Sequence, residues 1–147
     1  MLRVDPISSA DRVAWLSMRL ALYPEEPVHI IESEIDSFLS SGMIADREHC
    51  VLFARQHDRP VGFLEVSEFG HDRCHVESWY VTPQSRGSGV GRALIEACER
   101  WASARHAKVL TSDTNEDYPD SPPAHKACGF YASDDDTLFE KRLDAQS

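Results

Sequence analysis

Three glycines at alternate positions, Gly87, Gly89 and Gly91, separate a run of β-prone residues from a helical pattern. Because glycine has no Cβ, a backbone rich in glycine can approach a ligand closely. The free N–H groups at the start of a helix point toward such a ligand, and the helix dipole favours negative charge there. The segment from Tyr80 to Arg92 therefore predicts a site for a phosphate or pyrophosphate group.

Two common phosphate motifs do not fit this glycine segment. A P-loop needs Gly-Lys-Ser/Thr after its second glycine, whereas Gly89 is followed by Val90. A Rossmann turn needs G-x-G-x-x-G in the first βα unit of a parallel sheet, whereas the spacing here is G-x-G-x-G after strands that are expected to be antiparallel. The plain alternative to any phosphate site is a glycine-rich turn that only packs.

The N-terminal part of the chain predicts a strand and two helices. Ser8 or Ser9 can cap the first helix, and Pro24 and Pro27 end it because proline cannot continue the hydrogen-bond ladder. In the second helix apolar residues recur at helical spacing, and Gly42 is a stop signal. The strand is expected at 2–6 and the second helix at about 28–39, and the first helix is expected to follow its cap at Ser8 or Ser9 and to end before Pro24.

The rest of the chain predicts a short antiparallel sheet followed by alternating elements. Strands are expected at 50–55, 61–69 and 74–81, and their short polar connections favour antiparallel pairing. The helix after the glycines carries an apolar stripe at helical spacing. The later expected elements are a helix at about 90–105, a strand at 109–112, a polar loop at 115–123, a short helix at 124–128 and a strand at 137–143. The whole chain, 1–147, is expected to form one domain.

Composition narrows the class of protein. Lys and Arg total 15 against 25 Asp and Glu, a formal charge of -10 that argues against nucleic-acid binding, since phosphate contacts need basic residues. This acidity fits simple solubility or a cationic ligand. The N-terminus lacks an apolar signal core, and no run approaches the ~18 apolar residues of a membrane span. No membrane partner and a cytoplasmic location with reduced thiols are therefore expected.

Cysteine and histidine spacing does not favour a metal. The four cysteines are far apart and form no C-x-x-C pair. The segment from His71 to His75 holds three residues able to bind a metal, but a hairpin turn between two strands is the favoured interpretation.

The stretch Arg86-x-x-Gly89-x-Gly91 resembles the acetyl-CoA motif Arg/Gln-x-x-Gly-x-Gly/Ala of the GCN5-related N-acetyltransferases, and the order of elements resembles that family along nearly the whole chain. The resemblance implies an α/β (α+β) fold, with a mixed, mostly antiparallel sheet of about six to seven strands flanked by about four helices. It also implies that a bulge in the strand before the motif frees amides that bind acetyl-CoA and polarise its thioester. The matching positions are Trp79, Tyr80, Val81, Arg86, Gly87, Ser88, Gly89, Val90, Gly91 and Arg92.

A finer resemblance is to the aminoglycoside 6'-N-acetyltransferases, and four matches in chain order carry it. They are Trp15-Leu-Ser-Met-Arg19-Leu-Ala-Leu-Tyr23-Pro24, Gly62-Phe63-Leu-Glu65, Glu77-Ser-Trp79-Tyr80-Val81-x-Pro83, and Ser112-Asp113 with Ser121 and His125-Lys-Ala-Cys-Gly129-Phe130. The resemblance implies acetyl transfer from acetyl-CoA to the 6'-amine of a cationic antibiotic, and with it resistance. It implies direct attack, with no acyl-enzyme and no metal. Family members often form homodimers.

The chemistry assigns roles to three residues through this resemblance. The attacking amine must be neutral although aminoglycoside amines are mostly protonated, so a base or a water chain helps. Glu77 is expected to bind the antibiotic and accept a proton, and Asp113 is expected to be the second carboxylate. The plain alternatives are a solvated charge for Glu77 and a turn or cap for Asp113. His125 either protonates the leaving thiolate or packs within the fold.

The acceptor site is expected to be acidic. Tyr23 and Glu25 are expected to contact the antibiotic, and Glu25, Glu26, Asp113, Glu116, Asp117 and Asp120 lie in loops expected to rim the cleft. The hairpin at 68–74 is shorter than in related enzymes, and Phe69 is the aromatic residue expected to contact the substrate there. Two other functions stay open: acetylation of another amine, such as a polyamine or a protein N-terminus, and acyl-CoA binding without catalysis.

Overall fold

The computed structural model describes residues 1–143 and contains an eight-stranded sheet with strand order β1-β3-β4-β5-β6-β8-β7, β2 pairing with β3. Only β5 and β6 pair in parallel among the described strands. The strands are β1 (Leu2–Pro6), β2 (Met43–Ile44), β3 (Arg47–Gln56), β4 (Arg59–Glu68), β5 (Arg73–Val81), β6 (Val109–Asp113), β7 (Tyr131–Ala132) and β8 (Leu138–Arg142). The predicted mixed, mostly antiparallel sheet is confirmed. The two-residue strands β2 and β7 were not predicted, because so short a pairing leaves no period-2 pattern.

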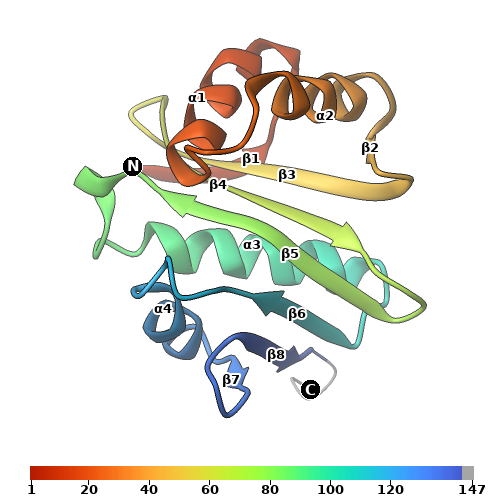
Figure 1. Ribbon diagram of the computed structural model, residues 1–147, viewed down its shortest axis with the longest axis vertical. Coiled ribbons are helices and arrows are strands. Elements are labelled where there is room, and N and C mark those ends of the chain that lie inside the picture. Colours follow the sequence, from red (N-terminus) through yellow and green to blue (C-terminus); the bar gives the residue numbers. More distant parts are fainter. Residues whose placement is uncertain (144–147) are drawn as a thin grey trace.

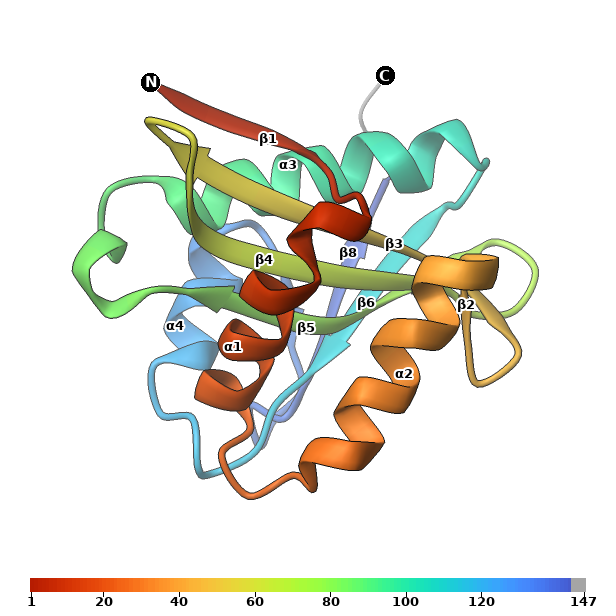
Figure 2. The same cartoon turned by 90° about the horizontal axis from the view of Figure 1, so that it is seen from above.

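Helices cover both faces of this sheet. Helices α1 (Arg12–Leu22) and α2 (Val28–Ser41) lie on one face, and α3 (Val90–Ala104) lies on the other, with α4 (Ser121–Ala127) on the same side as α3 (Figures 1 and 2). Two apolar clusters result, one around Trp15 and Phe63 beneath α1 and α2, and one around Leu94 beneath α3. Within residues 1–143 no helix is long and apolar enough to cross a membrane.

The predicted starts of three elements were wrong. Strand β3 begins at Arg47, three residues before the expected Cys50. Helix α4 begins at Ser121, three residues earlier than expected, because Pro122 and Pro123 occupy its first turn. Proline is tolerated there, since the N–H groups of the first turn have no intrahelical partner. Helix α1 begins at Arg12, after the short 3-10 helix η1 (Ser9–Asp11).

Strand β5 separates from β6 halfway along its length. The parallel pairing joins Arg73–Val76 to Val109–Ser112, after which β5 continues to Val81 and the two strands diverge (Figure 1). Against β4, the register of β5 shifts so that Val76 faces Val66 and Ser78 faces Glu65. Glu77 is therefore the extra residue of a β-bulge, which re-aims the side chains beyond it.

Candidate active site

A cavity of about 610 Å³ opens where β5 and β6 diverge. Its walls are β5 from Val76 to Val81, the start of α3, the loop after β6 and the first turns of α4. Gly87 and Gly91 line one end and Asp113 lines another. The divergence of the strands thus connects the glycine segment with the predicted second carboxylate.

The glycine turn, residues 86–91, presents open backbone to this cavity. Gly87 and Gly89 have φ angles of 79° and 90°, and a Cβ built on either would meet no atom within 4 Å. The Ala93 N–H donates to the Gly89 carbonyl at 3.0 Å, which closes the first turn of α3. The N–H groups of the preceding residues of the turn therefore have no partner within the helix. They can bind an anion.

Three side chains hold the shape of this turn by donating hydrogen bonds to backbone carbonyls. Arg86 Nε donates to the Val81 carbonyl at 2.9 Å, and Ser88 Oγ donates to the Ser85 carbonyl at 2.5 Å. Trp79 Nε1 donates to the Gly91 carbonyl at 3.2 Å, and a Cβ on Gly91 would lie 3.3 Å from the Trp79 ring. Gly91 is therefore where α3 packs closely on β5.

Three predicted cofactor residues have side chains that serve the fold. The Val90 side chain is buried in the core, and Arg92 donates to the Ala127 carbonyl at 2.7 Å, which links α3 to α4. The Tyr80 ring packs against Phe63 on the face covered by α1 and α2. Any contact of Val90 and Arg92 with a cofactor therefore comes from their backbone N–H groups.

The bulge brings Glu77 and Ser78 to the same face of the sheet. Ser67 Oγ donates to Glu77 Oε2 at 2.7 Å, and Arg47 lies 3.9 Å from the same oxygen. The Tyr23 hydroxyl donates to the Glu77 carbonyl at 3.1 Å and lies 3.0 Å from Ser78 Oγ. Burial raises the pKa of Tyr23 to about 12, so its hydroxyl remains a donor at neutral pH.

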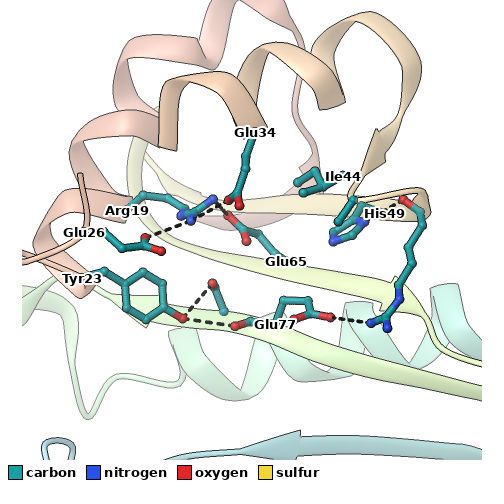
Figure 3. Close-up of a pocket in the computed structure, with 11 residues that line it drawn as sticks. Arg19, Tyr23, Glu26, Glu34, Ile44, His49, Glu65 and Glu77 are labelled. Atoms are coloured by element: carbon teal, nitrogen blue, oxygen red, sulfur yellow. Dashed lines mark hydrogen bonds and ion pairs between the residues drawn. The ribbon is translucent and has the colours of Figure 1, made fainter. Parts of the chain in front are cut away.

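A second cavity, of about 280 Å³, lies on this face between α1, α2 and β5 (Figure 3). Tyr23, Glu77 and Ser78 line both cavities. The predicted contacts Tyr23 and Glu77 therefore stand at the junction of the two spaces, and α1 helps to shape the acceptor side.

A buried ion network beneath this junction was not predicted. Trp15 Nε1 donates to Glu65 Oε2 at 2.8 Å, and Arg19 lies 3.5 Å from the same oxygen. Arg19 also pairs with Glu26 at 3.1 Å and Glu34 at 3.0 Å (Figure 3). Full burial raises the pKa of Glu65, and the positive charge of Arg19 opposes that rise. A sequence signal exists: Glu65 is a lone carboxylate within the apolar run of β4.

Asp113 lies at the mouth of the larger cavity. Its side chain is 62% exposed, and its Oδ2 accepts a hydrogen bond from His75 Nε2 at 3.1 Å. Asp117 and Asp120 also line this cavity, so three of the six expected rim carboxylates lie there. Glu26 lines the smaller cavity instead, and Glu25 and Glu116 are exposed residues outside both linings. The expected contact of Glu25 with the cavity is therefore wrong.

Tyr118 is a cavity residue that sequence reasoning missed. Its hydroxyl donates to the Leu22 carbonyl at 2.9 Å and fastens the loop after β6 to the end of α1. Both Tyr118 and Leu22 line the larger cavity.

His125 is buried and has a hydrogen-bond partner at each ring nitrogen. Nδ1 lies 2.8 Å from the Ser121 carbonyl, which only accepts, so Nδ1 carries the proton. Nε2 then accepts from Ser112 Oγ at 2.8 Å. The ring stacks on Phe139 at 4.1 Å, and burial lowers its pKa. These contacts favour the packing role over the proton-donor role.

Phe69 and the cysteines lie away from the larger cavity. Phe69 sits in the β4–β5 hairpin with the Arg47 guanidinium 4.3 Å from its ring centroid, and it is absent from the linings of both cavities described above. All four cysteines are free and buried, and burial raises the pKa of Cys50 and Cys74 to about 11. These are not thiols activated for covalent transfer. Residues 1–143 hold no cluster of three or more side chains arranged to bind a metal.

The family model described as "Acetyltransferase (GNAT) family" matches residues 12–130. The chain belongs to this family. It is thus an N-acetyltransferase that uses acetyl-CoA, and the open amides of the glycine turn beside a 610 Å³ cavity fit the pyrophosphate and its long arm.

Two named relatives and one solved structure are similar to this chain. The chain is 38% identical to aminoglycoside N(6')-acetyltransferase type 1 of Klebsiella aerogenes, over 95% of this chain and 96% of the relative. It is 34% identical to the enzyme of the same name from Stenotrophomonas maltophilia, over 92% and 90%. The structure of AAC(6')-Iy in complex with a bisubstrate analogue matches with a TM-score of 0.79 and 22% identity, covering 91% of this chain and 93% of that one. This last match supports the fold.

Proposed function

We propose that the protein transfers an acetyl group from acetyl-CoA to the 6'-amine of aminoglycosides. The observation that carries the proposal is that Glu77 and Asp113 line the cavity that begins at the glycine turn. The 38% identity to a named aminoglycoside N(6')-acetyltransferase supports this acceptor. An acidic rim suits a polycationic antibiotic.

The residues divide the work between binding and proton transfer. Acetyl-CoA supplies the activated acetyl group. The amides of residues 86–91 hold its pyrophosphate, and β5 backbone from Trp79 to Val81 orients the acyl end. Glu77 binds the ammonium group and accepts its proton directly or through water, and Asp113 grips the aminosugar from the opposite wall. The neutral amine then attacks the thioester carbonyl without an acyl-enzyme. The C–N bond forms as the C–S bond breaks, the nitrogen loses its second proton to water, and coenzyme A leaves as a thiol after taking a proton from solvent.

The assembly and location of the protein are part of the same proposal. We infer one domain that works in the cytoplasm, where the free, buried thiols stay reduced. A homodimer is the expected assembly, and analytical ultracentrifugation of the purified protein tests it. A sedimentation coefficient of a 16.6 kDa monomer at micromolar concentration contradicts the dimer.

An acceptor screen tests the function. Kanamycin and tobramycin, spermidine, and a peptide with a free N-terminus are each incubated with acetyl-CoA, and free thiol release is followed. We expect turnover of the aminoglycosides and a product acetylated at the 6'-amine by NMR. Turnover of only the peptide or spermidine contradicts the antibiotic acceptor, and coenzyme A binding without any turnover supports a non-catalytic domain.

Two substitutions test the carboxylates. Glu77→Gln and Asp113→Asn should each lower kcat/KM for the antibiotic by about a hundredfold, in the range of general-base and charged-contact losses. The affinity for coenzyme A, measured by calorimetry, should stay the same. Glu96→Gln, an exposed change on α3, is the matched control and should keep the parent activity.

A further inference from the structure

The parallel register of β5 and β6 places a histidine beside the proposed second carboxylate. His75 is paired with Thr111, and Val76 with Ser112 is the last pair of the ladder. Side chains alternate along a strand, so Asp113 returns to the face that carries Thr111. The His75 ring therefore lies along the end of β6, next to both side chains.

The hydrogen bonds of this ring define its protonation. A carboxylate oxygen only accepts hydrogen bonds, so His75 Nε2, 3.1 Å from Asp113 Oδ2, must carry a proton. In the neutral ring Nδ1 then accepts from the Thr111 hydroxyl at 2.7 Å. Asp113 thus sets the tautomer that points an N–H toward it, and the Thr111 hydroxyl holds the other ring nitrogen in place.

Asp113 is the last residue of β6, and its exposed side chain is free to change rotamer unless a partner holds it. Its side chain is 62% exposed, whereas that of His75 is only 18% exposed and is packed beside Phe69 with ring centroids 6.0 Å apart. An exposed carboxylate samples several rotamers, and each immobilised rotamer-rich side chain costs free energy when a ligand binds. A fixed N–H donor reduces that cost before the acceptor arrives.

We propose that His75, held by Thr111, is a positioning residue that fixes Asp113 for the cationic acceptor. The proposal rests on the proposed function, since it assigns His75 to the site that Asp113 forms. His75 acts through the carboxylate, because its Nε2 is engaged by Asp113 and its Nδ1 by Thr111. The chemistry recognised is an ammonium group on a polar scaffold.

Steady-state kinetics of four single variants tests the proposal. His75→Phe keeps a ring but loses both nitrogens, and it should raise the KM for kanamycin about tenfold, the loss expected for one hydrogen bond to a charged group. Thr111→Val keeps the shape but loses the hydroxyl, and about a threefold rise is expected. His75→Gln keeps an amide N–H and should remain within about twofold of the parent. His29→Phe, an exposed change on α2, is the control and should behave as the parent.

A double-mutant cycle separates positioning from a general structural effect. In an Asp113→Asn background, His75→Phe should cause no further change in kanamycin KM, since the group through which it acts is already altered. The KM for acetyl-CoA should stay within about twofold in every variant. An equal tenfold effect in both backgrounds overturns the proposal.

Nitrogen NMR of the histidine rings gives a readout that does not depend on activity. His75 in the parent at neutral pH should show a protonated Nε2 and an unprotonated Nδ1, and Thr111→Val should shift its tautomer balance. If His75→Phe fails to fold, as judged by circular dichroism, Thr111→Val and His75→Gln carry the test. A parent ring protonated only at Nδ1 overturns the proposal.

The outcomes also separate this proposal from the proposed function. If Asp113→Asn abolishes antibiotic turnover while His75→Phe matches the parent, the positioning role fails and the function stands. If Asp113→Asn is fully active on kanamycin, the role of Asp113 fails, and that of His75 fails with it. If the screen finds another amine, the same cycle on that amine still decides the role of His75.

Discussion

The proposed cofactor site and the proposed acceptor site, both beside β5, are built in different ways. On the cofactor side, seven consecutive residues from Arg86 to Arg92 present backbone N–H groups at the start of one helix. On the acceptor side, Tyr23, Glu77 and Asp113 reach the cavity from α1, β5 and β6. The first site depends on local backbone conformation, whereas the second depends on register, a bulge and buried charges. Substitutions in the two sites should therefore change different quantities: affinity for coenzyme A in the glycine turn, and turnover of the antibiotic at the acceptor site.

The largest effect is expected from Gly89→Val. At φ 90° a β-branched residue is strained, so the turn must rearrange and its amides lose their direction. Affinity for coenzyme A should fall about a hundredfold, as expected for losing two hydrogen bonds to a charged phosphate. Isothermal titration calorimetry measures this.

A matched glycine separates strain from function. Gly42 ends α2 with φ 75°, and a Cβ there would also meet nothing within 4 Å. Gly42→Val should therefore lower the melting temperature as Gly89→Val does, yet leave coenzyme A binding unchanged. Equal loss of binding in both variants would mean that the turn has no special role and would remove the contrast between the two sides.

This contrast explains what the sequence could predict. The glycine turn and α3 were predicted within one residue because glycine spacing and an apolar stripe are local patterns. Local sequence patterns also predicted the strands β3, β4 and β5. Such patterns did not predict β2 and β7, because each consists of two residues that are defined only by their pairing with a neighbouring strand.

On the acceptor side, the sequence pointed to Tyr23, Glu77 and Asp113, which line the larger cavity, and also to Glu25 and Phe69, which do not. The β4–β5 bulge that turns Glu77 and Ser78 to one face depends on cross-strand register, which a single strand does not encode. The same holds for His75 beside Asp113, a neighbour pair made by the parallel ladder. Glu65 carried a usable signal, since a carboxylate within a buried strand needs a cationic partner such as Arg19.

An intermediate effect on stability is expected at His125, whose ring lines the larger cavity and packs against Trp79. His125→Leu removes the partners of Ser112 and the Ser121 carbonyl, and it should lower the free energy of unfolding by about 2 kcal/mol at pH 8. Because the role is packing, kcat of the folded variant should fall by less than about threefold. Urea denaturation and steady-state kinetics measure the two quantities.

The pH dependence of this loss tests the protonation of His125. Burial holds its folded pKa below the ordinary 6.5, so below that pH the unfolded chain binds a proton that the folded chain does not. Stability of the parent therefore falls as pH drops through 6.5, and this component is missing in His125→Leu. The destabilisation should be smaller at about pH 5 than at pH 8. A larger one at pH 5, with kcat strongly reduced, would instead indicate a protonated, proton-donating ring.

The smallest effect is expected from the acidic rim, and it tests whether the acceptor side also works at a distance. The triple variant Glu25→Gln, Glu116→Gln, Asp117→Asn removes three exposed charges while leaving Glu77 and Asp113 in place. At low ionic strength kcat/KM for kanamycin should fall about threefold, because exposed charges steer a polycation toward the cavity. At about 0.5 M salt the difference should vanish, since the screening length shrinks to a few Å.

A control triple, Asp58→Asn, Glu96→Gln, Asp134→Asn, makes the same change in net charge away from the cavity and should have less than half the effect. If both triples behave alike, overall charge and not the rim sets the encounter rate. If the rim effect survives high salt, these carboxylates contact the bound antibiotic, and the acceptor site extends from β5 and β6 into the loops around it.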